Sequence, residues 1–170
     1  IKLTQDKNND YRLHIWPEEV RSFNKTQHPI HNHTYNIESL VVSGNVGCEA
    51  YSIEKNSISK SKLYEVHYSN LGSKLVSTNE SVSVEKKKIS WTNVGNIYKI
   101  KKGDYHQSVV EHNTFAATVV KNYNKSNDIK PNVIVNDDDN SEHNCPKEKI
   151  DKDFVLCKLK ELKNRVNNNL

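Results

Sequence analysis

The chain has 170 residues, of which 34% are hydrophobic and 27% charged, with a net charge of +4 and a mean hydropathy of −0.84. That length suits one domain, and the polarity indicates that only part of the chain packs into a core. No run approaches the roughly 18 apolar residues that a membrane span needs, so a transmembrane protein is excluded. The sequence begins at Ile1 and contains no Met, so we expect a trimmed N-terminus, and the loss of a targeting segment stays open.

The basic residues do not form a recognisable binding surface. There are 23 Asn and 22 Lys but only three Arg, a bias typical of an AT-rich genome rather than of a selected function. Nucleic-acid sites concentrate Arg and aromatic residues on one basic face, so we expect no nucleic-acid partner. The three Cys are widely spaced and form no CxxC pair, which argues against a disulfide framework or a cysteine zinc site and favours a cytoplasmic location.

Short β-rich runs separated by turn residues extend from Tyr11 to Tyr123. We expect strands at residues 11–16, 40–42, 63–68, 81–84, 89–91, 96–100 and 114–121, with turns at 43–44, 70–72 and 102–104. No long helical period interrupts this series. The pattern predicts one all-β domain over residues 1–123, an antiparallel sandwich or barrel.

The composition changes after Tyr123. Residues 124–149 are rich in Asn, Asp and Lys, and only 133–135 are able to pair or pack, so we expect a polar linker or an edge segment. Residues 150–168 then take up a helical period, with apolar residues at 155, 159, 162 and 166 and an N-cap at Asp151 or Asp153. They predict an amphipathic helix on the barrel or on a partner subunit, which leaves a homodimer open, since the stripe is short for membrane binding.

His31 and His33 are the first candidates for metal ligands. If residues 30–34 form a strand, both imidazoles project from one face, where two nitrogens can hold one ion. His106 supplies a third imidazole, three residues after Gly103. Such a set suits Fe(II), Mn(II), Ni(II) or Zn(II), and the sequence does not choose among them. The alternative is that all three are surface or hydrogen-bonded histidines on an unrelated β-protein.

These histidines lie in segments that resemble a known superfamily. The segment PIHNHT at residues 29–34, followed by Glu38 and Gly44, resembles the first motif of the cupins, and GDYH at residues 103–106 resembles the second. With the flanking strands, the resemblance covers about residues 11–123. It implies a double-stranded β-helix, or jelly-roll, barrel, here followed by the C-terminal helix.

Within the cupins, the chain is most similar to the cysteine-dioxygenase type, also called thiol dioxygenases. Those proteins carry an I-H-x-H-T core, a hydrophobic strand and a Gly-Asn turn, and a tyrosine about seventeen residues after the third histidine, where this chain has Tyr123. The resemblance implies a mononuclear Fe(II) ion held by His31, His33 and His106. It also implies open positions for O2 and for a small polar substrate, a thiol oxidised to its sulfinate, with Tyr123 as a catalytic, substrate-orienting hydroxyl.

The chain also departs from that family. The tyrosine's usual histidine and serine partners are missing, because Val119 and Lys121 stand near Tyr123. The arginine that anchors a substrate carboxylate lies upstream in the family, and the nearest candidate is Arg12, at a different spacing. The metal site is therefore better supported than the substrate.

Three further residues near the ligands are candidates for the site. Glu38 is a candidate catalytic base or fourth ligand, although strand parity puts it on the face opposite His31 and His33, where it would be a solvated residue. Tyr35 and Gln107 are candidate substrate-binding residues, with core packing and an outward orientation as their alternatives. A metal-dependent cupin isomerase or lyase would use the same ligands with Glu38 or Tyr123 as base. A non-enzymatic cupin that binds a small molecule would need none of this chemistry.

Overall fold

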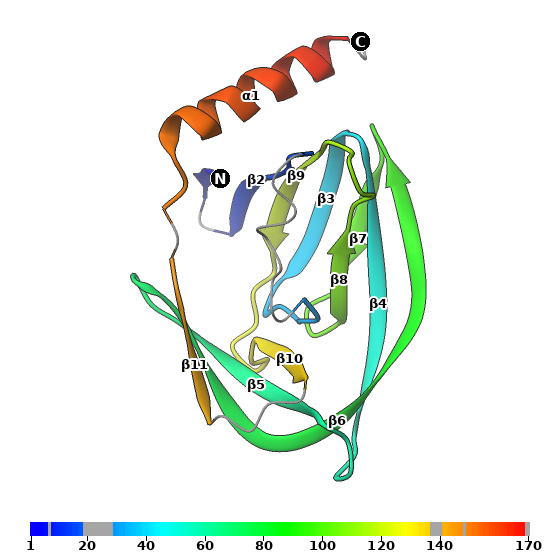
Figure 1. The fold of residues 1–170 in the computed structure, drawn as a ribbon, viewed down its shortest axis with the longest axis vertical. Helices are drawn as coiled ribbons and strands as arrows, with labels where there is room; N and C mark the ends of the chain where they lie inside the picture. The colour runs from blue at the N-terminus through cyan, green and yellow to red at the C-terminus, as the bar shows by residue number, and fades with distance from the viewer. Residues whose placement is uncertain (7, 19–28, 137–140, 148, 169–170) are drawn as a thin grey trace.

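The computed structural model describes residues 1–6, 8–18, 29–136, 141–147 and 149–168 (Figure 1). Within these residues the chain forms eleven strands and one C-terminal helix. The strands make two antiparallel sheets. The all-β class with a C-terminal helix is therefore confirmed.

The first sheet has five strands in the order β1-β2-β9-β3-β7. Their bounds are β1 Lys2–Gln5, β2 Asn9–Trp16, β9 Ala116–Tyr123, β3 Asn36–Ser43 and β7 Ile97–Ile100. In β3 every second residue is buried, as expected for a strand whose two faces meet different surroundings. Ile37 and Val41 lie on the buried face, whereas Glu38 and Leu40 lie on the other.

The second sheet contains β10, β5, β6, β4 and β8 in that order, with β11 also paired to β6. Their bounds are β4 Asn45–Lys55, β5 Ser61–Tyr68, β6 Gly72–Asn93, β8 Tyr105–Val109, β10 Asn132–Asn136 and β11 Glu142–Pro146. Two predicted strands, 81–84 and 89–91, are parts of the single long strand β6. The strand assignment of both segments is confirmed. Only the break between them was wrong, because the lysine run there contains no Gly or Pro to end a strand.

The two sheets pack face to face, with apolar residues from both between them. Val41 and Ala116 of the first sheet, for example, cluster with Val46 of the second. Within the described residues neither sheet closes on itself, so the described strands form an open sandwich and not a sealed barrel. The segment predicted to be a linker or edge, 124–149, contributes β10 and β11 to the second sheet.

The helix α1, Lys152–Asn167, lies across one end of the first sheet (Figure 1). Asp151 is its N-cap, and the Asp151 carboxylate accepts a hydrogen bond from the Phe154 amide at 2.8 Å. The helical side chains Leu159, Leu162 and Val166 pack against Leu13, Phe115 and Ala117. The apolar stripe read from the sequence is thus the docking face. No helix in the described part of the chain is long and apolar enough to cross a membrane.

Candidate metal centre

Three imidazoles from two distant segments meet between the sheets. The ring centroids lie 4.8 Å apart for His31 and His33, 4.7 Å for His31 and His106, and 5.1 Å for His33 and His106. One potential ligand nitrogen from each ring lies within 4.8 Å of the other two. The structure therefore brings together the three residues that the sequence proposed as metal ligands.

The backbone places His31 and His106 side by side. They form an isolated antiparallel bridge, in which the His31 amide donates to the His106 carbonyl at 3.1 Å and the His106 amide donates back at 2.9 Å. The expected strand over residues 30–34 is reduced to this bridge and a second one to Val133. Pro29, directly before this segment, has no amide proton, so it cannot donate a hydrogen bond that would extend the β-pairing in that direction. His33 is fixed through its carbonyl, which accepts from the Gly103 amide at 2.9 Å.

Backbone carbonyls also orient two of the rings. His31 Nδ1 lies 2.8 Å from the Pro29 carbonyl oxygen, and His106 Nδ1 lies 3.2 Å from that of Asp104. A neutral imidazole that donates from Nδ1 keeps the Nε2 lone pair for a metal, which is the usual arrangement around bound ions. His33 has a different support, since its ring stacks on Tyr35 with centroids 4.9 Å apart and planes at 17°.

A pair of asparagines clamps the histidine segment to β10. The Asn32 side-chain oxygen accepts from the Asn132 amide at 2.7 Å, and the Asn32 amide donates to the Asn132 carbonyl at 3.0 Å. Asn32 is only 6% exposed. Sequence reasoning missed both residues, although the apolar run at residues 133–135 was a signal that this segment pairs.

The surroundings keep the imidazoles neutral. Burial lowers the pKa of His106 to about 4, with a smaller effect from the neighbouring His31. Burial, followed by the charges of His31 and His106, lowers the pKa of His33 to about 2. Burial also lowers the pKa of His31, against the opposing effect of its hydrogen bond to Pro29. Because a metal binds only deprotonated nitrogen, these rings fit a divalent ion at neutral pH.

Glu38 and Tyr123 lie elsewhere. The Glu38 carboxylate forms an ion pair with Lys99 at 2.8 Å, and the hydrogen bond from Lys99 is the main cause that lowers its pKa. Strand parity places Glu38 on the face of β3 opposite its buried residues. Tyr123, in turn, lies beneath the Lys121 ammonium, 5.3 Å from the ring centroid. Among the described residues, no carboxylate joins the three imidazoles.

Gln107 does not face the imidazoles either. Successive residues of β8 point to opposite faces, so a buried His106 directs Gln107 outward. There the Tyr51 hydroxyl donates to the Gln107 side-chain oxygen at 3.4 Å and to the Glu49 carboxylate at 2.5 Å. The structure therefore connects Gln107 with Tyr51 and not with the candidate ligands.

Arg12 and Tyr35 line an open groove of about 1230 Å³ between the two sheets, which we call the inter-sheet groove. Other residues along it include Asp10, His14, Asn122 and Tyr123. Arg12 is not a free cation, because its guanidinium pairs with the Asp10 carboxylate at 2.7 Å. Tyr35 connects the groove with the metal centre, since its ring also stacks on His33.

The chain matches no protein-family model. A search of curated proteins likewise finds no match. The geometry of the site therefore carries the functional argument.

Proposed function

We propose that this protein is a metal-dependent enzyme of the cupin type, in which His31, His33 and His106 hold one Fe(II) ion. The observation that carries the proposal is the convergence of three imidazoles, one buried and two half-buried, two of them with Nδ1 held by a backbone carbonyl. Surface histidines need neither feature. Imidazole ligands also suit Zn(II), Mn(II) and Ni(II), and the choice of iron rests on the resemblance of the two histidine motifs to thiol dioxygenases.

The proposed reaction is the oxidation of a small thiol by O2. An Fe(II) ion supplies the redox chemistry that no side chain can, the transfer of electrons to O2. The three proposed ligands are neutral imidazoles with no carboxylate among them, so they leave the positive charge of the ion uncompensated. Such an ion favours an anionic partner such as a thiolate. The described part of the chain leaves Cys48, Cys145 and Cys157 as free thiols, in line with a reducing cytoplasm as the compartment.

The residues of the protein would do the positioning. Tyr35 forms the wall between His33 and the inter-sheet groove, so it limits how a substrate approaches the imidazoles. Arg12 and Asp10 lie along the same groove as a charged pair, available to hold the polar end of the substrate. A lyase or isomerase would instead need a base at the metal, and Glu38 is engaged with Lys99.

The test is metal loading under anaerobic conditions. Purified protein is incubated separately with Fe(II), Zn(II), Mn(II) and Ni(II), freed of excess ion and analysed for metal. We expect one ion per chain, and consumption of O2 only by the iron form in the presence of a small thiol. Absence of stoichiometric metal in every case refutes the metal site. One ion per chain without thiol-dependent O2 uptake refutes only the dioxygenase assignment.

A further inference from the structure

Two buried oxygens in the wall of the inter-sheet groove have no hydrogen-bond donor. Asp10 of β2 and Asn122 of β9 are direct cross-strand partners, and both line the groove. Within the described residues, neither Asp10 Oδ1 nor Asn122 Oδ1 has a partner. Asn122 is only 6% exposed. A buried acceptor without a donor destabilises the folded state, so this pair calls for a donor from outside the chain.

The other oxygen of Asp10 defines what that donor must be. Arg12 Nε donates a hydrogen bond to Asp10 Oδ2 at 2.7 Å, so the guanidinium is already paired with an anion. Of this cross-strand pair, one carboxylate oxygen and one amide oxygen, both acceptors, are left without a partner among the described residues. Cross-strand partners have Cβ atoms about 4.5–5.5 Å apart, a spacing that one small group can bridge. The negative charge of Asp10 would repel a carboxylate ligand and so offset the attraction of Arg12.

We propose that Asp10 and Asn122 form a subsite for a primary ammonium group of a small ligand. An ammonium has three donors and no acceptor, which matches the two unpaired oxygens. Its positive charge is also opposite to that of Asp10.

Tyr35 connects this subsite with the metal centre. It lines the groove together with Asp10 and Asn122. Its ring stacks on His33. The binding of an ammonium group is inferred from the geometry of the groove. That this group is the amine end of the substrate rests on the proposed function.

The experiment is a titration of metal-free, ¹⁵N-labelled protein with n-butylammonium, butyrate or 1-butanol, at constant pH and ionic strength. These probes share one chain and differ in the terminal group. We expect n-butylammonium alone to shift the backbone amide signals of Asp10 and Asn122 and the side-chain amide of Asn122, with saturation. Asp10→Asn should weaken the binding roughly tenfold, the loss of a charge-assisted hydrogen bond.

The matched control is Asp6→Asn, a second aspartate of the same groove. Its Oδ1 already accepts from the backbone amides of Asn8 and Asn9, both at 2.8 Å, so the affinity should not change. If Asp10→Asn does not fold, Arg12→Gln decides, because removing the competing cation should tighten the binding of n-butylammonium. Weaker or unchanged binding in Arg12→Gln contradicts the proposal.

Two results of the titration would overturn the subsite. If butyrate shifts these signals and n-butylammonium does not, Arg12 is an anion site instead. If neither probe shifts them, Asn122 itself donates to Asp10 with its amide turned round, and no subsite exists. The titration uses no metal, so a negative titration does not contradict the metal site. A negative metal-loading experiment, in turn, does not contradict the ammonium subsite.

Discussion

His31 and His106 bind each other through their backbones, with amide-to-carbonyl distances of 3.1 and 2.9 Å in the two directions. Each ring is then turned by a carbonyl two residues earlier in its own segment, that of Pro29 or Asp104. The two imidazoles are thus held by main-chain geometry, which changes little when a neighbouring side chain is replaced. We therefore expect the pair to keep its arrangement in the metal-free protein.

The first prediction concerns the ligands themselves. His31→Ala, His33→Ala and His106→Ala should each lower the affinity for a divalent ion by roughly 100-fold or more, since loss of even a supporting partner costs 10–100-fold. Metal content after equilibrium dialysis measures this. His67→Ala, a histidine whose side chain is 54% exposed on β5, is the control and should bind metal normally. Equal metal content in all four variants would mean that the ion is held elsewhere.

The second prediction tests the clamp between Asn32 and Asn132. Asn32→Ala leaves the Asn132 amide without its acceptor and removes a contact between the histidine segment and β10. The free energy of unfolding should fall by about 1–3 kcal/mol, measured by urea denaturation. Asn96→Ala is the comparison, because the Asn96 side chain is exposed and makes only a long contact of 3.5 Å. A similar small loss in both variants would show that the clamp contributes nothing.

That clamp also marks the limit of what the sequence predicts. The histidine pair, most of the strands and the apolar stripe of α1 follow from spacing and period, which are local properties. The pairing of Asn132 with Asn32 is a contact between distant segments, and the surrounding Asn-rich composition resembles a linker. The strand β4 was not predicted for a different reason: its small and polar residues, such as Cys48 and Ser52, give no apolar alternation.

The side chains at the candidate site divide in the same way. Glu38 lies on the half-exposed face of β3 and pairs with Lys99. Arg12 is a candidate because the resembled family anchors a substrate carboxylate with an upstream arginine. Its ion pair with Asp10 depends on side-chain placement, which residue type does not reveal. Residue types thus identified a group of three histidines that could hold a metal ion, whereas the character of the groove required the structure.

The third prediction compares two glycines with positive φ. Gly44, at φ 70°, joins β3 to β4, and an added Cβ would lie 2.2 Å from the Phe115 carbonyl oxygen. Gly95, at φ 82°, has nothing within 4 Å of that position. Gly95→Ala should therefore cost only backbone strain, about 1 kcal/mol, whereas Gly44→Ala adds a collision and should cost several kcal/mol. Thermal denaturation gives both values, and equal losses would contradict the collision.

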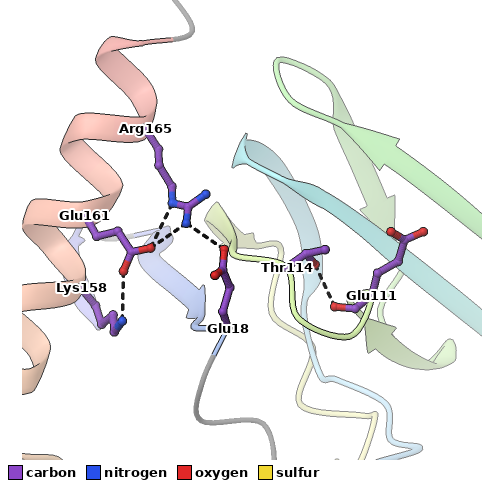
Figure 2. Close-up of polar contacts among 6 residues, drawn as sticks. All are labelled: Glu18, Glu111, Thr114, Lys158, Glu161 and Arg165. Atoms are coloured by element: carbon purple, nitrogen blue, oxygen red, sulfur yellow. Dashed lines mark hydrogen bonds and ion pairs between the residues drawn. The ribbon is translucent and has the colours of Figure 1, made fainter.

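The fourth prediction concerns the attachment of α1. Arg165 binds Glu161 on its own helix and Glu18 at 2.8 Å (Figure 2), and its guanidinium lies 4.6 Å from the ring centroid of the buried Phe115. The ion pairs are partly exposed and contribute little, so most of the effect comes from the cation–π contact. Arg165→Ala should lower the free energy of unfolding by about 1–2 kcal/mol.

Lys163→Ala is the control for this helix, because Lys163 is exposed on the same turn. Urea denaturation at low and high salt separates the two contributions, since salt screens the exposed ion pairs. We expect the greater part of the loss in Arg165→Ala to persist at 1 M salt. A loss that disappears at high salt would assign the attachment to the ion pairs instead.

The fifth prediction is the pH dependence of stability contributed by His14, which lines the inter-sheet groove. Burial, followed by the charges of the N-terminus and Arg12, lowers the pKa of His14 to about 4, below the value of about 6.5 in an unfolded chain. The unfolded state therefore binds more protons between these values. Stability is fully present above about pH 6.5 and declines as the pH falls toward 4.

The measurement is urea denaturation of the metal-free protein at pH 7 and pH 5, for the native chain and for His14→Gln. The unscreened pKa shift corresponds to about 2 kcal/mol lost by pH 5, but the residue is more than a third exposed, so solvent screening reduces this to about 1 kcal/mol. The native chain should lose that much more stability than His14→Gln between the two pH values. A native chain that loses no more than the variant would show that His14 is as well solvated in the groove as in the unfolded state.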